Sequence, residues 1–193
     1  MINHLGTQNI RTERLLLRKF EVIDAADIFA SWAKDPENVT YLTWNAHKDV
    51  EETRGILQKW LNSYQNEDCY KWCITLVPSR AAIGCFDVSE IEERIDCGNL
   101  HYVLSKNFWN NGIMTEALTA VLAFLFNYAN FNRVTAGHDI RNQASGRVMR
   151  KVGMRLEGVA KAGCLDNCGN FQDFVNYAIT REDWLTRDGN QVA

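Results

Sequence analysis

The stretch Tyr102-Val-Leu-Ser-Lys-Asn-Phe-Trp-Asn-Asn-Gly-Ile-Met-Thr-Glu-Ala-Leu118 decides the fold. It runs from an apolar strand through a short polar turn, which contains Gly112, into a helix that we expect to begin at Thr115. Such a turn points several backbone N–H groups and the positive end of a helix at one spot. A spot of this kind binds anions, phosphates above all. The stretch therefore predicts a phosphate-bearing ligand, with an ordinary capped turn as the alternative.

A second segment of the same design follows one strand later. The expected strand Arg133–His138 leads into Asn142-Gln-Ala-Ser145, where Asn142 is a plausible N-cap for a second helix. Gly153 suits the C′ position that ends this helix. The two segments together predict a polar reaction centre beside the phosphate site.

Composition excludes several classes of protein. The chain has 193 residues, which favours one domain, and its 21 Lys and Arg are interleaved with 24 Asp and Glu, so that the net charge is −3. No basic stripe for a nucleic acid is visible. The first residues lack the apolar core of a signal peptide, and the longest apolar run is too short to cross a bilayer. We therefore expect a cytoplasmic protein without nucleic-acid or membrane partners.

The six cysteines include two pairs at Cys-x-x-x-Cys spacing, Cys69/Cys73 and Cys164/Cys168. Four thiolates are a zinc ligand set, but structural zinc sites more often use two-residue spacing, and Cys73 lies inside an apolar strand pattern. We expect free thiols and no metal.

Periodicity places further elements on both sides of these segments. Helices are expected at Asp24–Ala33, with Asp24 as N-cap, and from Asp49 onward. Strands are expected at Leu15–Phe20, Tyr70–Val77, Ala82–Val88, Met154–Ala160 and Phe171–Ile179. The strands that flank the Thr115 helix should be parallel, joined by a right-handed crossover. The result is an α+β fold, with a mixed sheet and helices on its faces.

The combined segments resemble the GCN5-related N-acetyltransferase (GNAT) superfamily. They are most similar to the branch that acetylates the N-terminal alanine of ribosomal proteins. Three matches carry the resemblance: Trp109-x-x-Gly-Ile-Met-Thr-Glu-Ala117, Asn142-x-x-Ser145 with Lys151-x-Gly153, and Leu156-Glu-Gly158. It covers nearly the whole chain, from Arg11 to Ile179, and implies one acetyltransferase domain over 1–193 with a core of about 11–181. The implied sheet has six to seven strands, about four helices, and splayed fourth and fifth strands.

The resemblance also implies acetyl-CoA as cosubstrate. Its pyrophosphate should lie on the backbone N–H groups near Asn110–Thr115, and its pantetheine arm should pair with the strand Tyr102–Leu104. Where the family has Gln or Arg first and Gly or Ala last in this loop, the chain has Trp109 and Met114, and Asn110 stands where the branch often has Gly. The implied cofactor contacts are Tyr102, Val103, Leu104, Trp109, Asn110, Asn111, Gly112, Ile113, Met114, Thr115, Asn142, Ser145 and Lys151.

The implied reaction is direct attack of an amine on the acetyl carbonyl. A backbone N–H near Leu104 should polarise that carbonyl. Many relatives protonate the leaving thiolate with a Tyr four residues beyond Ser145, but that residue is Met149 here, so Ser145 becomes the expected acid.

The general base is left open. The branch often has a carboxylate at the position of Asn99, which cannot act as a base. His101, two residues on and on the same strand face, and His138 on the next strand are candidates, as are Asp87 and Glu90. A protein α-amine is also partly neutral near pH 7.7–8.0 and needs no dedicated base.

Three readings of the function follow. The first is acetylation of a protein or peptide N-terminus, with a homodimer as the family's common state. The second is acetylation of a small amine, such as a polyamine, an aminoglycoside or an amino-acid-like toxin. The third is a non-catalytic module that senses acyl-CoA. We expect Trp32 and Trp60 in the core and Trp44, in a loop, at the acceptor cleft.

Overall fold

One sheet of eight strands forms the centre of the molecule, and a computed structural model describes residues 1–189. The strands lie in the order β1-β2-β3-β4-β5-β6-β8-β7. Their bounds are β1 Ile10–Arg11, β2 Leu15–Arg18, β3 Tyr70–Leu76, β4 Ala82–Glu92, β5 Cys97–Leu104, β6 Arg133–Asp139, β7 Arg155–Leu165 and β8 Phe171–Thr180. Residues 190–193, which the expected domain includes, lie outside the described part.

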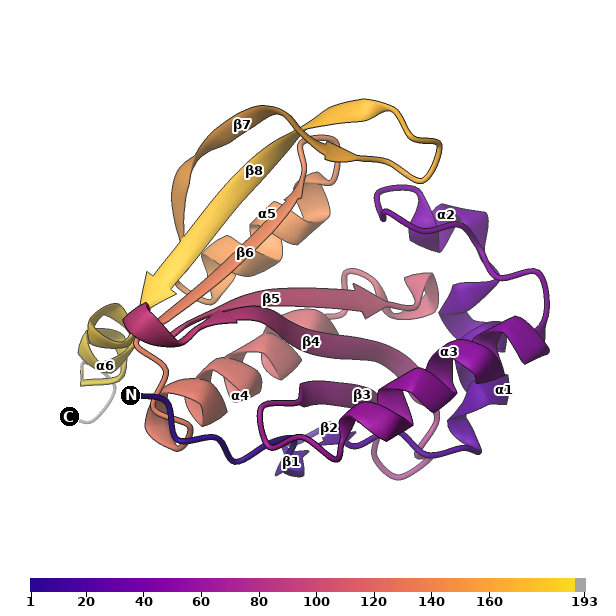
Figure 1. Ribbon diagram of the computed structural model, residues 1–193, viewed down its shortest axis with the longest axis horizontal. Helices are drawn as coiled ribbons and strands as arrows, with labels where there is room; N and C mark the ends of the chain where they lie inside the picture. Colours follow the sequence, from indigo (N-terminus) through magenta and orange to yellow (C-terminus); the bar gives the residue numbers. More distant parts are fainter. Residues whose placement is uncertain (190–193) are drawn as a thin grey trace.

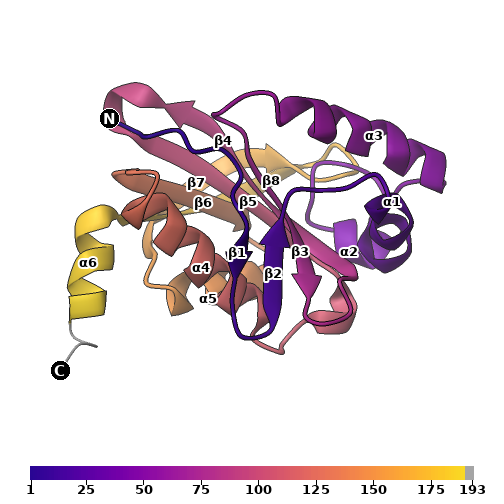
Figure 2. The ribbon, with the colours of Figure 1, turned by 90° about the horizontal axis from the view of Figure 1, so that it is seen from below.

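Helices cover both faces of this sheet. In Figure 2, α3 lies on one face and α4 on the other. The bounds are α1 Asp24–Ile28, α2 Pro36–Val39, α3 Val50–Ser63, α4 Ile113–Asn127, α5 Gln143–Lys151 and α6 Arg181–Gly189. A π-helical turn, Phe29–Ala33, extends α1. The fold class is therefore the mixed α+β class that the sequence predicts.

The core is divided by the sheet. The larger cluster buries the apolar stripe of α4, including Leu118, Val121, Leu122 and Leu125, against one face. The smaller cluster includes Phe20, Ile28, Trp32 and Leu57 from the α1–α3 side. Burying such side chains contributes about 1.5–3 kcal/mol each, so both faces hold their helices firmly.

Caps define two of the helices. Asp49 accepts a hydrogen bond from the Glu52 N–H at 2.8 Å and begins α3. Asn142 accepts one from the Ser145 N–H at 3.2 Å and begins α5. Gly153, at a φ of +89°, follows the end of α5. All three roles are as the sequence predicts.

The parallel pair β5 and β6 is short. Its register runs from Cys97 opposite Arg133 only to Leu100 opposite Ala136. Beyond that point the strands separate, and Figure 1 shows them close together near their starts and apart toward their ends. The predicted crossover around α4 and the predicted splay are both present.

Other expectations at element ends are wrong. The helix α4 begins at Ile113 rather than Thr115, because Gly112 takes the N-cap position at a φ of +75° with no side-chain cap. Asp24 is not an N-cap: it lies within α1, and its carboxylate accepts two hydrogen bonds from Arg18, at 2.7 and 2.8 Å. The sheet has eight strands rather than six to seven. The sequence patterns do not predict β1, α2 or α6.

Candidate active site

A cleft of about 510 Å³ opens where β5 and β6 diverge. Its walls come from β5, the turn after it, the N-terminal ends of α4 and α5, and the α2 segment. The lining residues from the predicted site are Tyr102, Val103, Leu104, Trp109, Asn110, Gly112, Ile113, Met114, Thr115, Asn142, Ser145 and Lys151. The topology thus brings the two quoted segments together around one space.

The free edge of β5 faces this cleft. The Ser105 N–H donates to the Ile83 carbonyl on the β4 side at 2.8 Å. Because successive N–H groups of a strand point to opposite edges, the Leu104 N–H points toward the side from which β6 has departed. A carbonyl oxygen in the cleft finds a backbone donor there.

The end of β5 is held by a side chain that sequence reasoning missed. Asn38, from α2, donates from Nδ2 to the Leu104 carbonyl at 2.8 Å and accepts from the Lys106 N–H at 2.8 Å. The indole N–H of Trp109 donates to the same Leu104 carbonyl at 2.8 Å. These bonds fix the strand end, the following turn and α2 relative to one another.

The anion-binding end is built from backbone. Asn110 and Gly112 have φ values of +60° and +75°, and the first N–H groups of α4 have no acceptor within the helix. The side chains of Ile113 and Met114 are buried in the core, so their backbone faces the cleft. Lys151, which lines the same cleft from α5, adds positive charge. This arrangement suits a pyrophosphate.

Ser145 meets an unexpected partner inside the cleft. Its Oγ lies 2.7 Å from the hydroxyl of Tyr102, which also donates to the Ser145 carbonyl at 3.2 Å. Burial raises the pKa of Tyr102 well above its usual value. Met149, at the family's usual tyrosine position, is fully buried. Met149 therefore offers no proton, whereas the hydroxyls of Ser145 and Tyr102 both line the cleft.

The two candidate histidines lie outside the cleft lining. His138 is buried; its Nδ1 donates to the Asp139 carbonyl at 2.7 Å, and its Nε2 has no partner and abuts Gly146. His101 is exposed and stands opposite Asp87 on the sheet. Among the implied cofactor contacts, Asn111 is also absent from the lining: its carbonyl accepts a hydrogen bond from Arg14 at 3.0 Å.

The expectation for Trp44 is wrong. Its ring packs edge-on against the buried Trp32, at 6.1 Å between centroids, and belongs to the α1–α3 cluster rather than the cleft. The α2 side of the cleft is instead formed by Glu37, Asn38, Tyr41 and Leu42. Trp32 lies in the core as expected, and Trp60 packs against its cluster.

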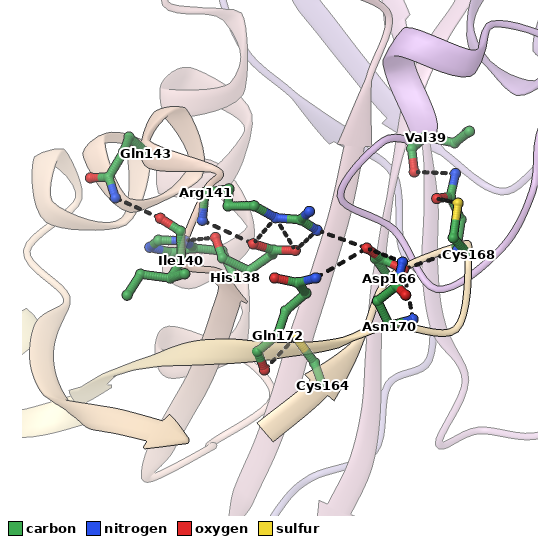
Figure 3. Close-up of polar contacts among 12 residues, drawn as sticks. Val39, His138, Ile140, Arg141, Gln143, Cys164, Asp166, Cys168, Asn170 and Gln172 are labelled. Carbon is green, nitrogen blue, oxygen red and sulfur yellow. Dashed lines mark hydrogen bonds and ion pairs between the residues drawn. The ribbon is translucent and has the colours of Figure 1, made fainter. Parts of the chain in front are cut away.

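Arg141 organises the far wall of the cleft (Figure 3). Its guanidinium donates to Asp139 at 2.5 Å and reaches Asp166, in the β7–β8 loop, at 3.2 Å. Burial opposes ionisation of Asp139, but the hydrogen bonds from Arg141 outweigh it and lower the pKa of that carboxyl. Hydrogen bonds from Asn170 and Cys168 N–H groups similarly lower the pKa of Asp166. The β7–β8 loop is thereby tied to the start of α5.

The same loop touches the opposite side of the cleft. Asn167 donates from Nδ2 to the Val39 carbonyl of α2 at 3.4 Å, and Arg141 lies over the ring of Tyr41 at 5.7 Å. These contacts link residues more than 90 positions apart and connect the α2 side of the cleft to the β7–β8 loop and the start of α5.

Within 1–189, no three His, Cys, Asp or Glu side chains gather in a way that holds a metal ion, and the six cysteines are free. None of the helices in that range is long and apolar enough to span a membrane.

Comparison with known proteins agrees with this geometry. The family model described as an acetyltransferase (GNAT) domain matches residues 14–155. The chain belongs to the GNAT acetyltransferase family. It is an N-acetyltransferase, and GNAT acetyltransferases use acetyl-CoA.

Three relatives illustrate the range of the family. The [ribosomal protein uS5]-alanine N-acetyltransferase of Escherichia coli is 26% identical over 163 residues, covering 73% of this chain and 84% of that protein. A GNAT-family acetyltransferase from Bacillus anthracis is 26% identical, with a TM-score of 0.78, covering 91% of this chain and 99% of that one. The microcin C7 self-immunity acetyltransferase MccE, solved with acetyl-CoA and AMP, is 18% identical, with a TM-score of 0.79. The match covers 88% of this chain and 93% of that one. This GNAT chain therefore has the expected fold with the splayed strands described above.

Proposed function

We propose that this N-acetyltransferase transfers acetyl from acetyl-CoA to the N-terminal amine of a protein or peptide, by direct attack in a ternary complex. The observation that carries the proposal is the early end of the β5–β6 pairing, at Leu100 and Ala136, beside the N-termini of two helices. One domain over 1–193, with its core at about 11–181, accords with the single eight-stranded sheet of the described residues.

Binding of the cosubstrate rests mainly on backbone. The free edge of β5 at Tyr102–Leu104 offers peptide groups to the pantetheine amides. The N-terminal end of α4, with Gly112, accepts the pyrophosphate, because the open N–H groups and the helix dipole favour negative charge. Ile113 and Met114 anchor this helix end in the core and keep its N–H groups in place. Departures from the family loop at Asn110 and Met114 leave these backbone contacts intact.

Each chemical requirement of the transfer has a group in the cleft. The Leu104 N–H stabilises negative charge on the acetyl oxygen. Ser145 supplies a hydroxyl for the leaving thiolate. A neutral fraction of the attacking amine is present near neutral pH, because an α-amine titrates near pH 7.7–8.0. His101 is exposed and accepts a proton only through solvent, whereas the Nε2 of His138 is buried without a partner. We propose that the reaction depends on neither histidine.

The acceptor end favours a peptide N-terminus. Glu37, Tyr41 and Arg141 give the far end of the cleft polar hydrogen-bonding groups of both charges. A peptide presents amide groups next to its amine. Amides both donate and accept hydrogen bonds, so they match the mixed polar groups at this end of the cleft. The E. coli relative that acts on a ribosomal protein alanine supports this reading at 26% identity.

A small primary amine is the second candidate. The contact of Asn167 with the Val39 carbonyl spans the acceptor end and limits the thickness of what passes beneath it. A compact amine enters such a space without displacing the β7–β8 loop.

Release of CoA thiol from acetyl-CoA tests both candidates. The panel includes peptides that begin with Ala or Ser, the same peptides with blocked N-termini, polyamines and aminoglycosides. We expect turnover with free peptides and none with blocked ones. A preference for a polyamine or aminoglycoside selects the second candidate. Tight acetyl-CoA binding without turnover on any amine contradicts the proposed function and favours an acyl-CoA sensor.

A further inference from the structure

The hydroxyl groups of Tyr102 and Ser145 form a close pair in the cleft, and the Ser145 carbonyl, at 3.2 Å, is a second acceptor for the Tyr102 hydroxyl. The oxygens lie 2.7 Å apart, on elements 43 residues distant, and no other side chain among residues 1–189 hydrogen-bonds to either hydroxyl. Tyr102 stands on β5 and Ser145 in the first turn of α5, so that the pair spans the space between the strand edge and the helix.

Ser145 by itself is a poor proton donor. An aliphatic hydroxyl holds its proton much more strongly than a phenol does. In free solution an alkyl thiol titrates near pH 8.5 and a phenol near pH 10, so a phenol matches a thiolate better as a proton donor than an aliphatic hydroxyl does. The buried Met149 offers no alternative. A phenol behind the serine therefore lowers the energetic obstacle.

We propose that Tyr102 is the proton source for the leaving thiolate and acts through the hydroxyl of Ser145. The inference rests on the proposed function. When the carbon–sulfur bond breaks, the sulfur keeps the electron pair. Ser145 then transfers its proton to sulfur, and the Tyr102 proton replaces it on the Ser145 Oγ.

The proton balance closes through solvent. The new amide nitrogen releases one proton, either to water or to a nearby acceptor. Water returns one proton to the Tyr102 phenolate after CoA has left. The net reaction is amine plus acetyl-CoA to amide plus CoA thiol, with no other reactant consumed.

The environment of Tyr102 supports this role. Burial raises its pKa, so the phenol stays protonated at neutral pH. The same burial also disfavours a charged thiolate, so burial moves both acids in the same direction. Tyr102 is also positioned by packing against Phe86, at 5.6 Å between ring centroids.

The test uses Tyr102→Phe, Ser145→Ala and the double variant. We expect each single change to lower kcat roughly 100-fold, which is the lower range for loss of a general acid, with the KM for acetyl-CoA little changed. Because both groups serve one proton transfer, the double variant should be no slower than about the slower single variant. A further measurement follows kcat as the fraction of heavy water in the solvent is varied. For wild type, this dependence should indicate two protons in motion, and for Tyr102→Phe it should not. Tyr64→Phe is the matched control: it removes a partly buried, hydrogen-bonded phenol from the other face of the sheet and should leave turnover unchanged.

A binding measurement separates this inference from the proposed function. Calorimetry at pH 8.5 compares CoA with its desulfo analogue, which lacks the thiol. We expect wild type to prefer CoA by about tenfold, since hydrogen bonds to a charged sulfur are strong, and both single variants to lose that preference. Any one of three results overturns the relay. These are a kcat for Tyr102→Phe within threefold of wild type, defects that multiply in the double variant, and a preference for CoA that is unchanged in the single variants. A wild type that is inactive on every amine contradicts the proposed function, and the CoA preference still decides the relay.

Discussion

Arg14 donates from Nε to Oε2 of Glu116 at 2.6 Å and so ties the chain before β2 to the first turn of α4. Its Nη1 donates to the Asn111 carbonyl at 3.0 Å. Burial opposes ionisation of Glu116, but hydrogen bonds from Thr12 and Arg14 outweigh it and lower the pKa of that carboxyl. The arginine thus holds both the proposed pyrophosphate turn and the helix that follows it.

Arg14→Ala should weaken acetyl-CoA binding without altering the reacting groups. Loss of hydrogen bonds to a charged partner costs about 1.5 kcal/mol at a half-exposed site, which corresponds to a roughly tenfold higher Kd. Calorimetric titration with acetyl-CoA measures it. Arg54→Ala, which breaks an exposed ion pair on α3, is the control and should leave Kd unchanged. An unaltered Kd in Arg14→Ala means that the turn keeps its shape without this contact.

Gly112→Ala should also weaken acetyl-CoA binding. At a φ of +75°, a side chain costs about 1–2 kcal/mol, and it also obstructs close approach of a phosphate. We expect a tenfold or greater rise in Kd together with a small loss of stability. Gly55→Ala, in α3 with open space around its Cα, provides the matched change and should bind normally. Equal affinities of the two variants contradict the pyrophosphate assignment.

Much of this site was predictable because its signals are local. A strand, a turn with one glycine and a helix follow each other within Tyr102–Leu118, and Asn142 caps α5 through the Ser145 N–H only three residues away. The parallel crossover follows from chirality rules that need no long-range information. These local features are sufficient to predict that the two segments meet at one site.

The remainder depends on contacts between distant residues. Asn38 lies in a four-residue helix, too short for a periodic pattern, and its acceptor is 66 residues away. The partnership of Tyr102 with Ser145 cannot be read from strand alternation, which gives a face but no neighbour. Trp44 was misplaced because its loop folds back onto Trp32, and nothing in the local sequence indicates that return.

Asn38→Ala should lower turnover more than it lowers cofactor affinity. The partly buried Lys106 N–H loses its acceptor, and the Leu104 carbonyl keeps only the Trp109 indole. A buried donor left unsatisfied costs about 1–3 kcal/mol, and the end of β5 should shift with it. We expect kcat to fall about tenfold, measured by thiol release at saturating acetyl-CoA. A kcat equal to wild type, in a protein with normal melting temperature, contradicts a role for Asn38 in holding the oxyanion donor. Asn66→Ala, in the loop before β3, serves as the control.

Asp139 provides a prediction on acid stability. Its folded pKa lies below the value of about 3.9 for an unfolded chain, so the unfolded state binds more protons between these two values. Its contribution to stability is therefore complete at neutral pH. That contribution is lost as the pH falls below about 4 and through the folded pKa.

Asp139→Asn should remove that contribution while preserving shape. At pH 7 the free energy of unfolding should fall by about 1.5 kcal/mol, because the carboxylate that Arg141 binds is gone. Below about pH 4 the difference between wild type and variant should shrink, since the unfolded wild-type carboxyl then binds a proton more readily than the folded one does. Urea unfolding at about pH 7 and about pH 2.5 measures both differences.

Other carboxylates, Asp166 among them, also lose their stabilising charge in acid, so only the difference between the two proteins reports on Asp139. Asp68→Asn, an exposed residue in the loop before β3, should change stability little at either pH. A gap between wild type and Asp139→Asn that stays constant from pH 7 to 2.5 contradicts a charge-based role, and leaves packing alone as the reason for the loss.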